Sequence, residues 1–150
     1  MTTNNTIDII ENLIQTCRNG EEGYRSAAEH TNDLDLRDFF DREAKERARF
    51  ARELERVAQD LGEPEPSRDT SVASKVHRAW FDLKQKFGGG DESVVESVEA
   101  GESDARTEYQ EALDASLPFD VRSIVERQFE SIAIAYDRVC ALRDQFKRAA

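Results

Sequence analysis

Residues 34–64 read LDLRDFFDREAKERARFARELERVAQDLGEP, and this stretch indicates the fold class of the chain. Its apolar residues recur every three or four positions, which is the spacing of one face of an α-helix. They are Phe40, Ala44, Phe50, Ala51, Leu54, Ala58 and Leu61. Gly62 and Pro64 follow directly, a pairing typical of the end of a helix. The sequence therefore predicts an amphipathic helix over residues 34–61.

The same periodicity predicts helices over residues 6–31, 70–87, 91–116 and 118–146. We expect Thr6 and Asp91 to cap the first and fourth of the five helices, and Pro118 to lie in the first turn of the last. Short turns join the first two helices and the last two into antiparallel hairpins. Patterns of period two, typical of strands, are absent. The prediction is an all-α, ferritin-like four-helix bundle: a single domain over residues 1–150, with two antiparallel hairpins joined by a crossover containing a shorter fifth helix.

The charge of the chain disfavours several classes of partner. The 150 residues include 21 basic and 32 acidic ones, giving a formal net charge of -11. Such a field repels polyanions, so we expect neither a nucleic acid nor an anionic membrane surface as partner. The charges alternate in sign along the helices, as expected of solvated faces carrying i,i+4 ion pairs.

The cysteines and the N-terminal residues indicate a compartment. Cys17 and Cys140 are far apart and form no C-x-x-C motif, so a disulfide framework is not indicated. The first residues lack the basic and apolar regions of a signal peptide, and no run is long and apolar enough to span a membrane. We expect a cytoplasmic protein.

Polar residues interrupt the apolar face of each long helix near its middle. They are Glu21, Glu43, Arg47, Glu102 and Gln128. Positions at similar depth on four helices are expected to meet in one layer of a bundle. Four-helix bundles use that level for a metal, a cofactor or a buried ion network.

Two interpretations of this polar layer remain open. Inward carboxylates hold iron or manganese in ferritin-like bundles, and the candidate ligands here are Glu21, Glu43, Glu99 and Glu102. That chemistry needs two Glu-x-x-His pairs, however, and the sequence contains none. Arg47 can neutralise carboxylates as a metal would. We favour a buried hydrogen-bonded network with no cofactor, while three carboxylates facing one arginine keep a metal site as the alternative.

Other residues suggest packing roles. Trp80 lies on the apolar face of the predicted crossover helix, with His77 beside it. Phe129 and Tyr136 share a line at the flank of the last helix, where we expect contact with the crossover helix or a partner chain. The remaining apolar surface predicts a homo-oligomer. The sequence has no phosphate-binding glycine loop, nucleophile constellation or zinc spacing, so an enzyme is not favoured; if the protein is one, it is a di-metal oxidoreductase.

Several segments, in their order and spacing, resemble a bacterial family of ferritin-like four-helix-bundle proteins known as domain of unknown function 2383. They are residues 19–24 (NGEEGY), 46–51 (ERARFA), 61–64 (LGEP), 77–80 (HRAW), 99–102 (EAGE) and 109–113 (YQEAL). The resemblance extends from about residue 7 to residue 144. The chain departs from the family pattern at Asn19, where Asp is common, and at Tyr136, where a His often precedes the Asp.

The resemblance implies the fold and a stress-related role, and it implies no known reaction. The functional prediction is a non-enzymatic, stress-associated bundle that binds a partner or itself. The alternative is an iron- or manganese-binding protein with oxidoreductase activity.

Overall fold

The computed structural model describes residues 3–62 and 90–149, which form four long helices and no strand. The helices are α1 (Thr3–Glu29), α2 (Leu34–Asp60), α4 (Gly90–Asp114) and α5 (Phe119–Ala149). The all-α prediction is confirmed. The predicted crossover helix over residues 70–87 lies outside the described residues.

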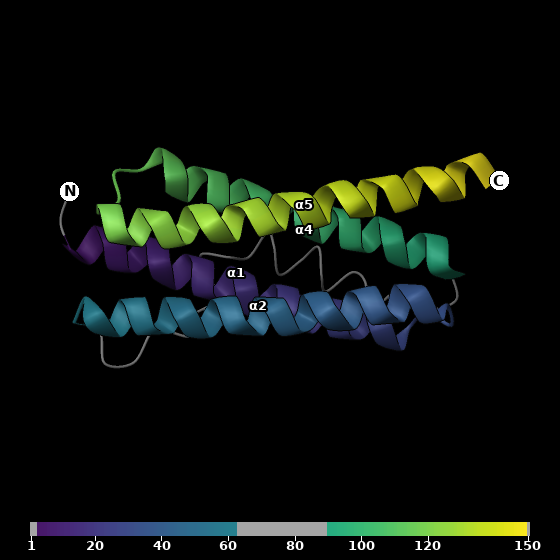
Figure 1. Cartoon of the computed structure of the whole chain (residues 1–150), viewed down its shortest axis with the longest axis horizontal. Coiled ribbons are helices and arrows are strands. Elements are labelled where there is room, and N and C mark those ends of the chain that lie inside the picture. Colours follow the sequence, from purple (N-terminus) through teal and green to yellow (C-terminus); the bar gives the residue numbers. More distant parts are fainter. Residues whose placement is uncertain (1–2, 63–89, 150) are drawn as a thin grey trace.

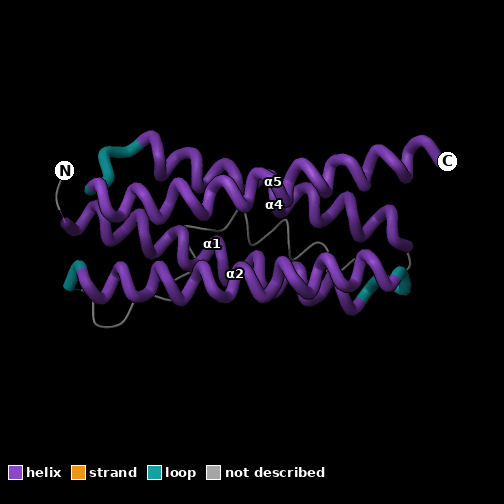
Figure 2. Tube along the Cα trace, viewed as in Figure 1, coloured by secondary structure: helices purple, strands orange, loops and turns teal. Residues whose placement is uncertain are grey.

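The helices pack as a four-helix bundle made of two antiparallel hairpins (Figures 1 and 2). Helix α1 lies against α2 and against α4, and α4 lies against α5. Helices α2 and α5 make the fewest contacts of the adjacent pairs. Helix α4 runs in the same direction as α2 (Figure 1), so the end of α2 and the start of α4 lie at opposite ends of the bundle, as in the ferritin-like arrangement.

Helix α2 begins and ends almost where its sequence predicts. The Asp33 carboxylate accepts hydrogen bonds from the backbone N–H groups of Asp35 and Leu36 at 2.9 and 3.1 Å, which satisfies donors that the first turn leaves free. At the other end Gly62 has φ +105, a conformation that favours glycine. Both ends of α2 are therefore encoded by local backbone chemistry.

The predicted caps of α1 and α4 are wrong. Helix α1 begins at Thr3, and the Thr6 side chain is buried. Helix α4 begins at Gly90, and the carboxylate of Asp91 accepts a hydrogen bond from the Thr31 hydroxyl at 2.6 Å instead of capping its own helix. Thr6 thus lies inside its helix, and Asp91 is used by a contact with the end of α1.

The core consists of two apolar clusters. One contains Tyr24, Phe39, Phe40 and the valines of α4, and the other contains Ile10, Leu13, Leu54, Tyr109 and Ile132 among its members. The buried side chains of Arg47, Glu102 and Gln128 belong to neither cluster. None of the described helices carries a stretch apolar enough to cross a membrane.

Candidate functional site

The middle of the bundle holds an ion pair between Arg47 of α2 and Glu102 of α4. Their side chains are 1% and 0% exposed. Arg47 Nη1 donates to Glu102 Oε1 at 2.7 Å, and Nη2 donates to Oε2, so two parallel hydrogen bonds join the groups. Bidentate pairing of this kind is the strongest form of an arginine–carboxylate contact.

Tyr24 of α1 completes this ion pair. Its hydroxyl donates to Glu102 Oε2 at 2.5 Å, and the Arg47 guanidinium carbon lies 5.4 Å from the centre of its ring. Burial raises the pKa of Tyr24 well above its usual range, and the negative charge of Glu102 adds to this. Burial alone would lower the pKa of Arg47, but the charge and hydrogen bonds of Glu102 outweigh it and hold that pKa well above normal. The tyrosine therefore stays neutral and the arginine stays charged.

Gly20 of α1 makes room for the arginine. A Cβ atom at this position would lie 3.3 Å from Arg47 Nη1 and 3.5 Å from Arg47 Cγ. The guanidinium cannot move away without breaking its hydrogen bonds to Glu102. A glycine inside a helix, which costs about 1 kcal/mol relative to alanine, is thus explained by the position of Arg47.

Glu43 lies at the edge of the same ion pair, one helical turn before Arg47. Its Oε1 is 3.7 Å from Arg47 Nη2 and is buried, yet it accepts no hydrogen bond from the described residues. Burial raises the pKa of the Glu43 carboxyl to about 7, against the opposing effect of Arg47. This carboxyl is therefore partly protonated near neutral pH, which removes part of the excess negative charge expected of the layer.

Gln128 belongs to a second network. The Tyr109 hydroxyl donates to Gln128 Oε1 at 2.6 Å, and the Gln128 amide donates to Glu53 Oε1 at 2.8 Å. The Cys17 sulfur lies 3.0 Å from the Tyr109 oxygen and serves as donor, because the tyrosine proton is used by Gln128. Burial raises the pKa of the Cys17 thiol to about 11, so it remains protonated. One hydrogen-bonded chain thus joins all four described helices.

Two of the predicted layer and metal residues lie elsewhere. Glu21 pairs with Arg18 at 3.2 Å and with Arg25 at 2.6 Å, both on its own helix. Glu99 pairs with Arg143 of α5. The predicted residues therefore occupy four places instead of one layer. Helical-wheel positions give only the direction of a Cβ atom. The carboxylate of a long, flexible glutamate at the edge of an apolar face turns toward a neighbouring arginine.

Two of the four predicted packing residues lie in the described part of the chain, and both are half-buried. Phe129 is half-buried and packs against one apolar cluster. Tyr136 is also half-buried, and the guanidinium carbon of Arg106 lies 5.5 Å from the centre of its ring. His77 and Trp80 lie outside the described residues.

A metal does not fit the described side chains well. Each of the four candidate ligands pairs with an arginine: Glu21 with Arg18 and Arg25, Glu43 and Glu102 with Arg47, and Glu99 with Arg143. In residues 3–62 and 90–149, nowhere do three or more His, Cys, Asp or Glu side chains come together as a metal site. A cation at Glu102 would have to displace a guanidinium that is already bound by both oxygens.

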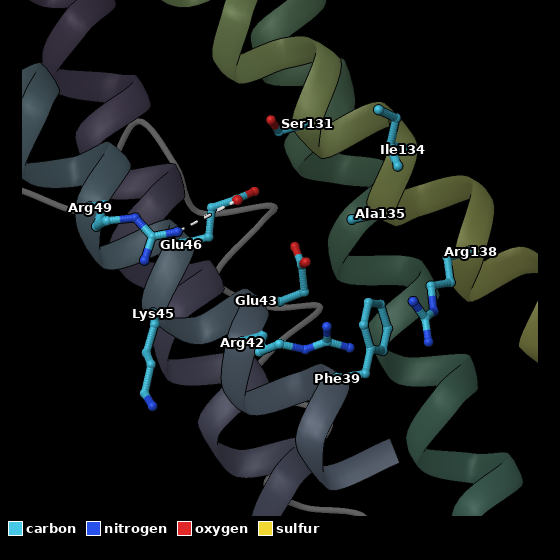
Figure 3. Close-up of a pocket in the computed structure, with 10 residues that line it drawn as sticks. All are labelled: Phe39, Arg42, Glu43, Lys45, Glu46, Arg49, Ser131, Ile134, Ala135 and Arg138. Carbon is cyan, nitrogen blue, oxygen red and sulfur yellow. Dashed lines mark ion pairs between the residues drawn. The ribbon is translucent and has the colours of Figure 1, made fainter. Parts of the chain in front are cut away.

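A surface groove lies beside the ion pair, between α2 and α5 (Figure 3). Its volume is about 410 Å³. The lining residues are Phe39, Arg42, Glu43, Lys45, Glu46 and Arg49 from α2, and Ser131, Ile134, Ala135 and Arg138 from α5. Glu43 thus joins the groove to the interior, since it contacts Arg47 on one side and lines the groove on the other.

The sequence did not reveal the groove or the residues that hydrogen-bond to Glu102 and Gln128. Tyr24, Tyr109 and Glu53 were not predicted as members of the polar layer. A signal was present for the two tyrosines, because a buried phenol needs a hydrogen-bond partner and each lies on a helix face that carries a buried polar residue. For the groove no signal exists in one sequence, because it depends on the separation of α2 and α5.

Comparison with known protein families identifies one family that the chain matches. A model described as a domain of unknown function (DUF2383) matches residues 5–115. The chain belongs to this family. The DUF2383 match includes Gly20, Tyr24, Arg47 and Glu102, and it ends before α5. No curated protein matches the chain.

Proposed function

We propose that this DUF2383 protein is a non-enzymatic, stress-associated bundle that acts by binding a partner or a second copy of itself. The observation that supports the proposal is the Arg47–Glu102 pair, which lies where a ferritin-like bundle would hold its metal. The guanidinium already neutralises this carboxylate and binds both of its oxygens, so an iron or manganese ion would have to displace it.

The two buried networks support a structural role for the interior. Their hydroxyl, amide and thiol groups are hydrogen-bonded to one another, and the pKa values of Tyr24 and Cys17 keep both side chains protonated at neutral pH. Such networks fix the register of packed helices. Because the polar side chains of the interior hold the helices together, we place the binding of a partner on the outer surface of the bundle.

One observation favours the alternative, a protein that binds iron or manganese and has oxidoreductase activity. Glu43 Oε1 is buried without a hydrogen bond from the described residues, and its carboxyl is held by the same arginine as Glu102. If Arg47 moved aside, both carboxylates would face one ion.

Elemental analysis separates these two functions. The protein is incubated anaerobically with Fe(II) and Mn(II), desalted and analysed, together with Glu102→Gln and the control Glu111→Gln, which changes an exposed carboxylate on the same helix. We expect less than about 0.1 metal ion per chain in all three proteins. A structural or catalytic site would retain a stoichiometric amount of metal through desalting, so this low content would mean that no such site is present. About one or two ions per chain, lost in Glu102→Gln but not in Glu111→Gln, would overturn the proposal.

A further inference from the structure

The groove between α2 and α5 carries more positive than negative charge. The charged side chains that line it are the cationic Arg42, Lys45, Arg49 and Arg138 and the anionic Glu43 and Glu46. Both carboxylates already have a cationic neighbour within the chain. Glu46 pairs with Arg49 at 3.7 Å, and Glu43 pairs with the buried Arg47 at 3.7 Å. The groove therefore retains positive charge in a chain whose formal net charge is -11.

Two arginines, one from each helix, meet at one end of the groove. The side chains of Arg42 on α2 and Arg138 on α5 extend toward one another, with the Phe39 ring between them in this view (Figure 3). In residues 3–62 and 90–149, neither guanidinium makes a hydrogen bond or an ion pair. Lys45, by contrast, points away from α5 (Figure 3). The free positive charge of the groove is thus concentrated at Arg42 and Arg138.

Phe39 holds Arg138 in place. The guanidinium carbon of Arg138 lies 4.6 Å from the centre of the Phe39 ring, which is itself buried against Tyr24 and Phe40. A ring attracts a guanidinium without accepting a conventional hydrogen bond from it, so the N–H donors of Arg138 remain available. A donor group that is already positioned loses less conformational entropy when a ligand binds.

Glu43 opposes an anion in the groove less than an ordinary glutamate would. Its carboxyl points into the space between α2 and α5 (Figure 3), and its buried Oε1 accepts no hydrogen bond from the described residues. Because burial raises the pKa of this carboxyl to about 7, the neutral form predominates below that pH. A neutral carboxyl can donate a hydrogen bond to an anion instead of repelling it.

We propose that the groove binds a small organic anion whose phosphate or carboxylate group lies between Arg42 and Arg138. The planar N–H groups of arginine match the geometry of both oxyanions and form charge-assisted hydrogen bonds with them. The groove volume of about 410 Å³ is in the range of small-molecule sites and leaves room for more than the oxyanion. Along the rest of the groove, Ser131 offers a hydroxyl and the 70% exposed Ile134 offers an apolar edge.

The overall charge of the chain restricts the ligand to a small molecule. A net charge of -11 repels a long polyanion that extends over the acidic surface. A molecule that fits between α2 and α5 interacts mainly with the nearby guanidinium groups, because salt screens more distant charges over about 8 Å at physiological ionic strength. The site goes beyond the proposed function, since it requires neither a protein partner nor a metal.

An NMR titration of the isotope-labelled full chain tests the site. Inorganic phosphate and succinate are the probes, at about pH 6.5 and at a constant ionic strength of about 0.05 M, where surface charges are only partly screened. We expect at least one probe to shift the side-chain N–H resonances of Arg42 and Arg138 in a saturable way, with a Kd of about 1 mM or below. The probe that binds more tightly shows whether the site prefers a phosphate or a carboxylate.

Matched variants separate this site from general attraction of anions to the surface. Arg42→Gln and Arg138→Gln should each weaken binding by at least about tenfold, because each removes one arm of the site. The control Arg52→Gln removes the same charge from an exposed position of α2 outside the groove, and should change the Kd by less than about twofold. Circular dichroism checks that the variants are folded, as expected for exposed side chains.

Three results would overturn the site. They are the absence of saturable shifts with both probes up to about 20 mM, binding that persists unchanged in Arg42→Gln and Arg138→Gln, and equal weakening by Arg42→Gln and Arg52→Gln. Metal content is measured in a separate experiment, so failure of this site and failure of the proposed function give different results.

Discussion

At the scale of single residues, Arg47 is the buried counter-ion of Glu102. It is fully buried, neutralises Glu102 through two hydrogen bonds and packs on Tyr24. A buried charge is tolerated only when it is paired and hydrogen-bonded. Here the tyrosine hydroxyl and the guanidinium together provide Glu102 with three donors.

Glu43 should make stability depend on pH. Its pKa is about 7 in the folded protein, against 4.5 for an ordinary glutamate, so the folded state binds the proton more tightly than the unfolded state. The free energy of unfolding should therefore fall as pH rises from about 4.5 to about 7, and level off above that. The expected loss is about 1–3 kcal/mol, the lower values reflecting partial exposure of the side chain.

Urea unfolding at pH 5 and pH 8 measures this effect. Glu43→Gln, which cannot ionise, should remove most of the difference between the two pH values, and the exposed control Glu111→Gln should keep it. A wild-type protein whose stability rises with pH over this interval, or a Glu43→Gln variant that retains the full slope, would show that another group is responsible.

At the scale of elements, prediction from sequence succeeded where local chemistry determines the structure. Helix α2 begins after Asp33 and ends before Gly62, and both residues act through their own backbone neighbourhood. It failed for Thr6, whose side chain is buried within α1, and for Asp91, whose carboxylate binds the Thr31 hydroxyl. A capping preference is a local property, and a tertiary contact overrides it.

Gly20→Ala tests the close packing of α1 against α2. Helix propensity alone would make this change stabilising by about 1 kcal/mol. The new methyl group would lie 3.3 Å from an Arg47 nitrogen that is fixed by Glu102. We therefore expect the free energy of unfolding to fall by about 1 kcal/mol or more, as is usual when a well-packed core is overfilled.

The same substitution in an Arg47→Met background provides the control. Without the guanidinium the methyl group has room, so Gly20→Ala should then be neutral or stabilising. Thermal or urea unfolding of the four proteins measures the difference. Equal effects of Gly20→Ala in the two backgrounds would mean that Arg47 does not determine the need for glycine.

At the scale of the whole molecule, two hydrogen-bonded networks share residues with the two apolar clusters and join the helices. The chain of Cys17, Tyr109, Gln128 and Glu53 takes one residue from each described helix. The bundle is thus specified by polar contacts as well as by apolar packing.

The bundle architecture could be predicted from the sequence, but the arrangement of the site could not. Apolar periodicity gives helices, turn lengths give hairpins, and a polar residue on an apolar face must be buried with a partner. Which partner it finds depends on side-chain reach: Glu102 meets Arg47, whereas Glu21 turns to Arg18 and Arg25. Distances across a bundle are set by all four helices at once, so they are not encoded in any one of them.

A double-mutant cycle at Arg47 and Glu102 tests most directly whether these residues neutralise each other inside the bundle. Urea unfolding at neutral pH, without added metal, is measured for Arg47→Met, Glu102→Gln and the double variant. Each single change should lower the free energy of unfolding by about 3–5 kcal/mol, because it leaves a buried charge without its partner. The double variant should lose at least about 2 kcal/mol less than the sum of the two. Strictly additive losses would contradict the buried ion pair.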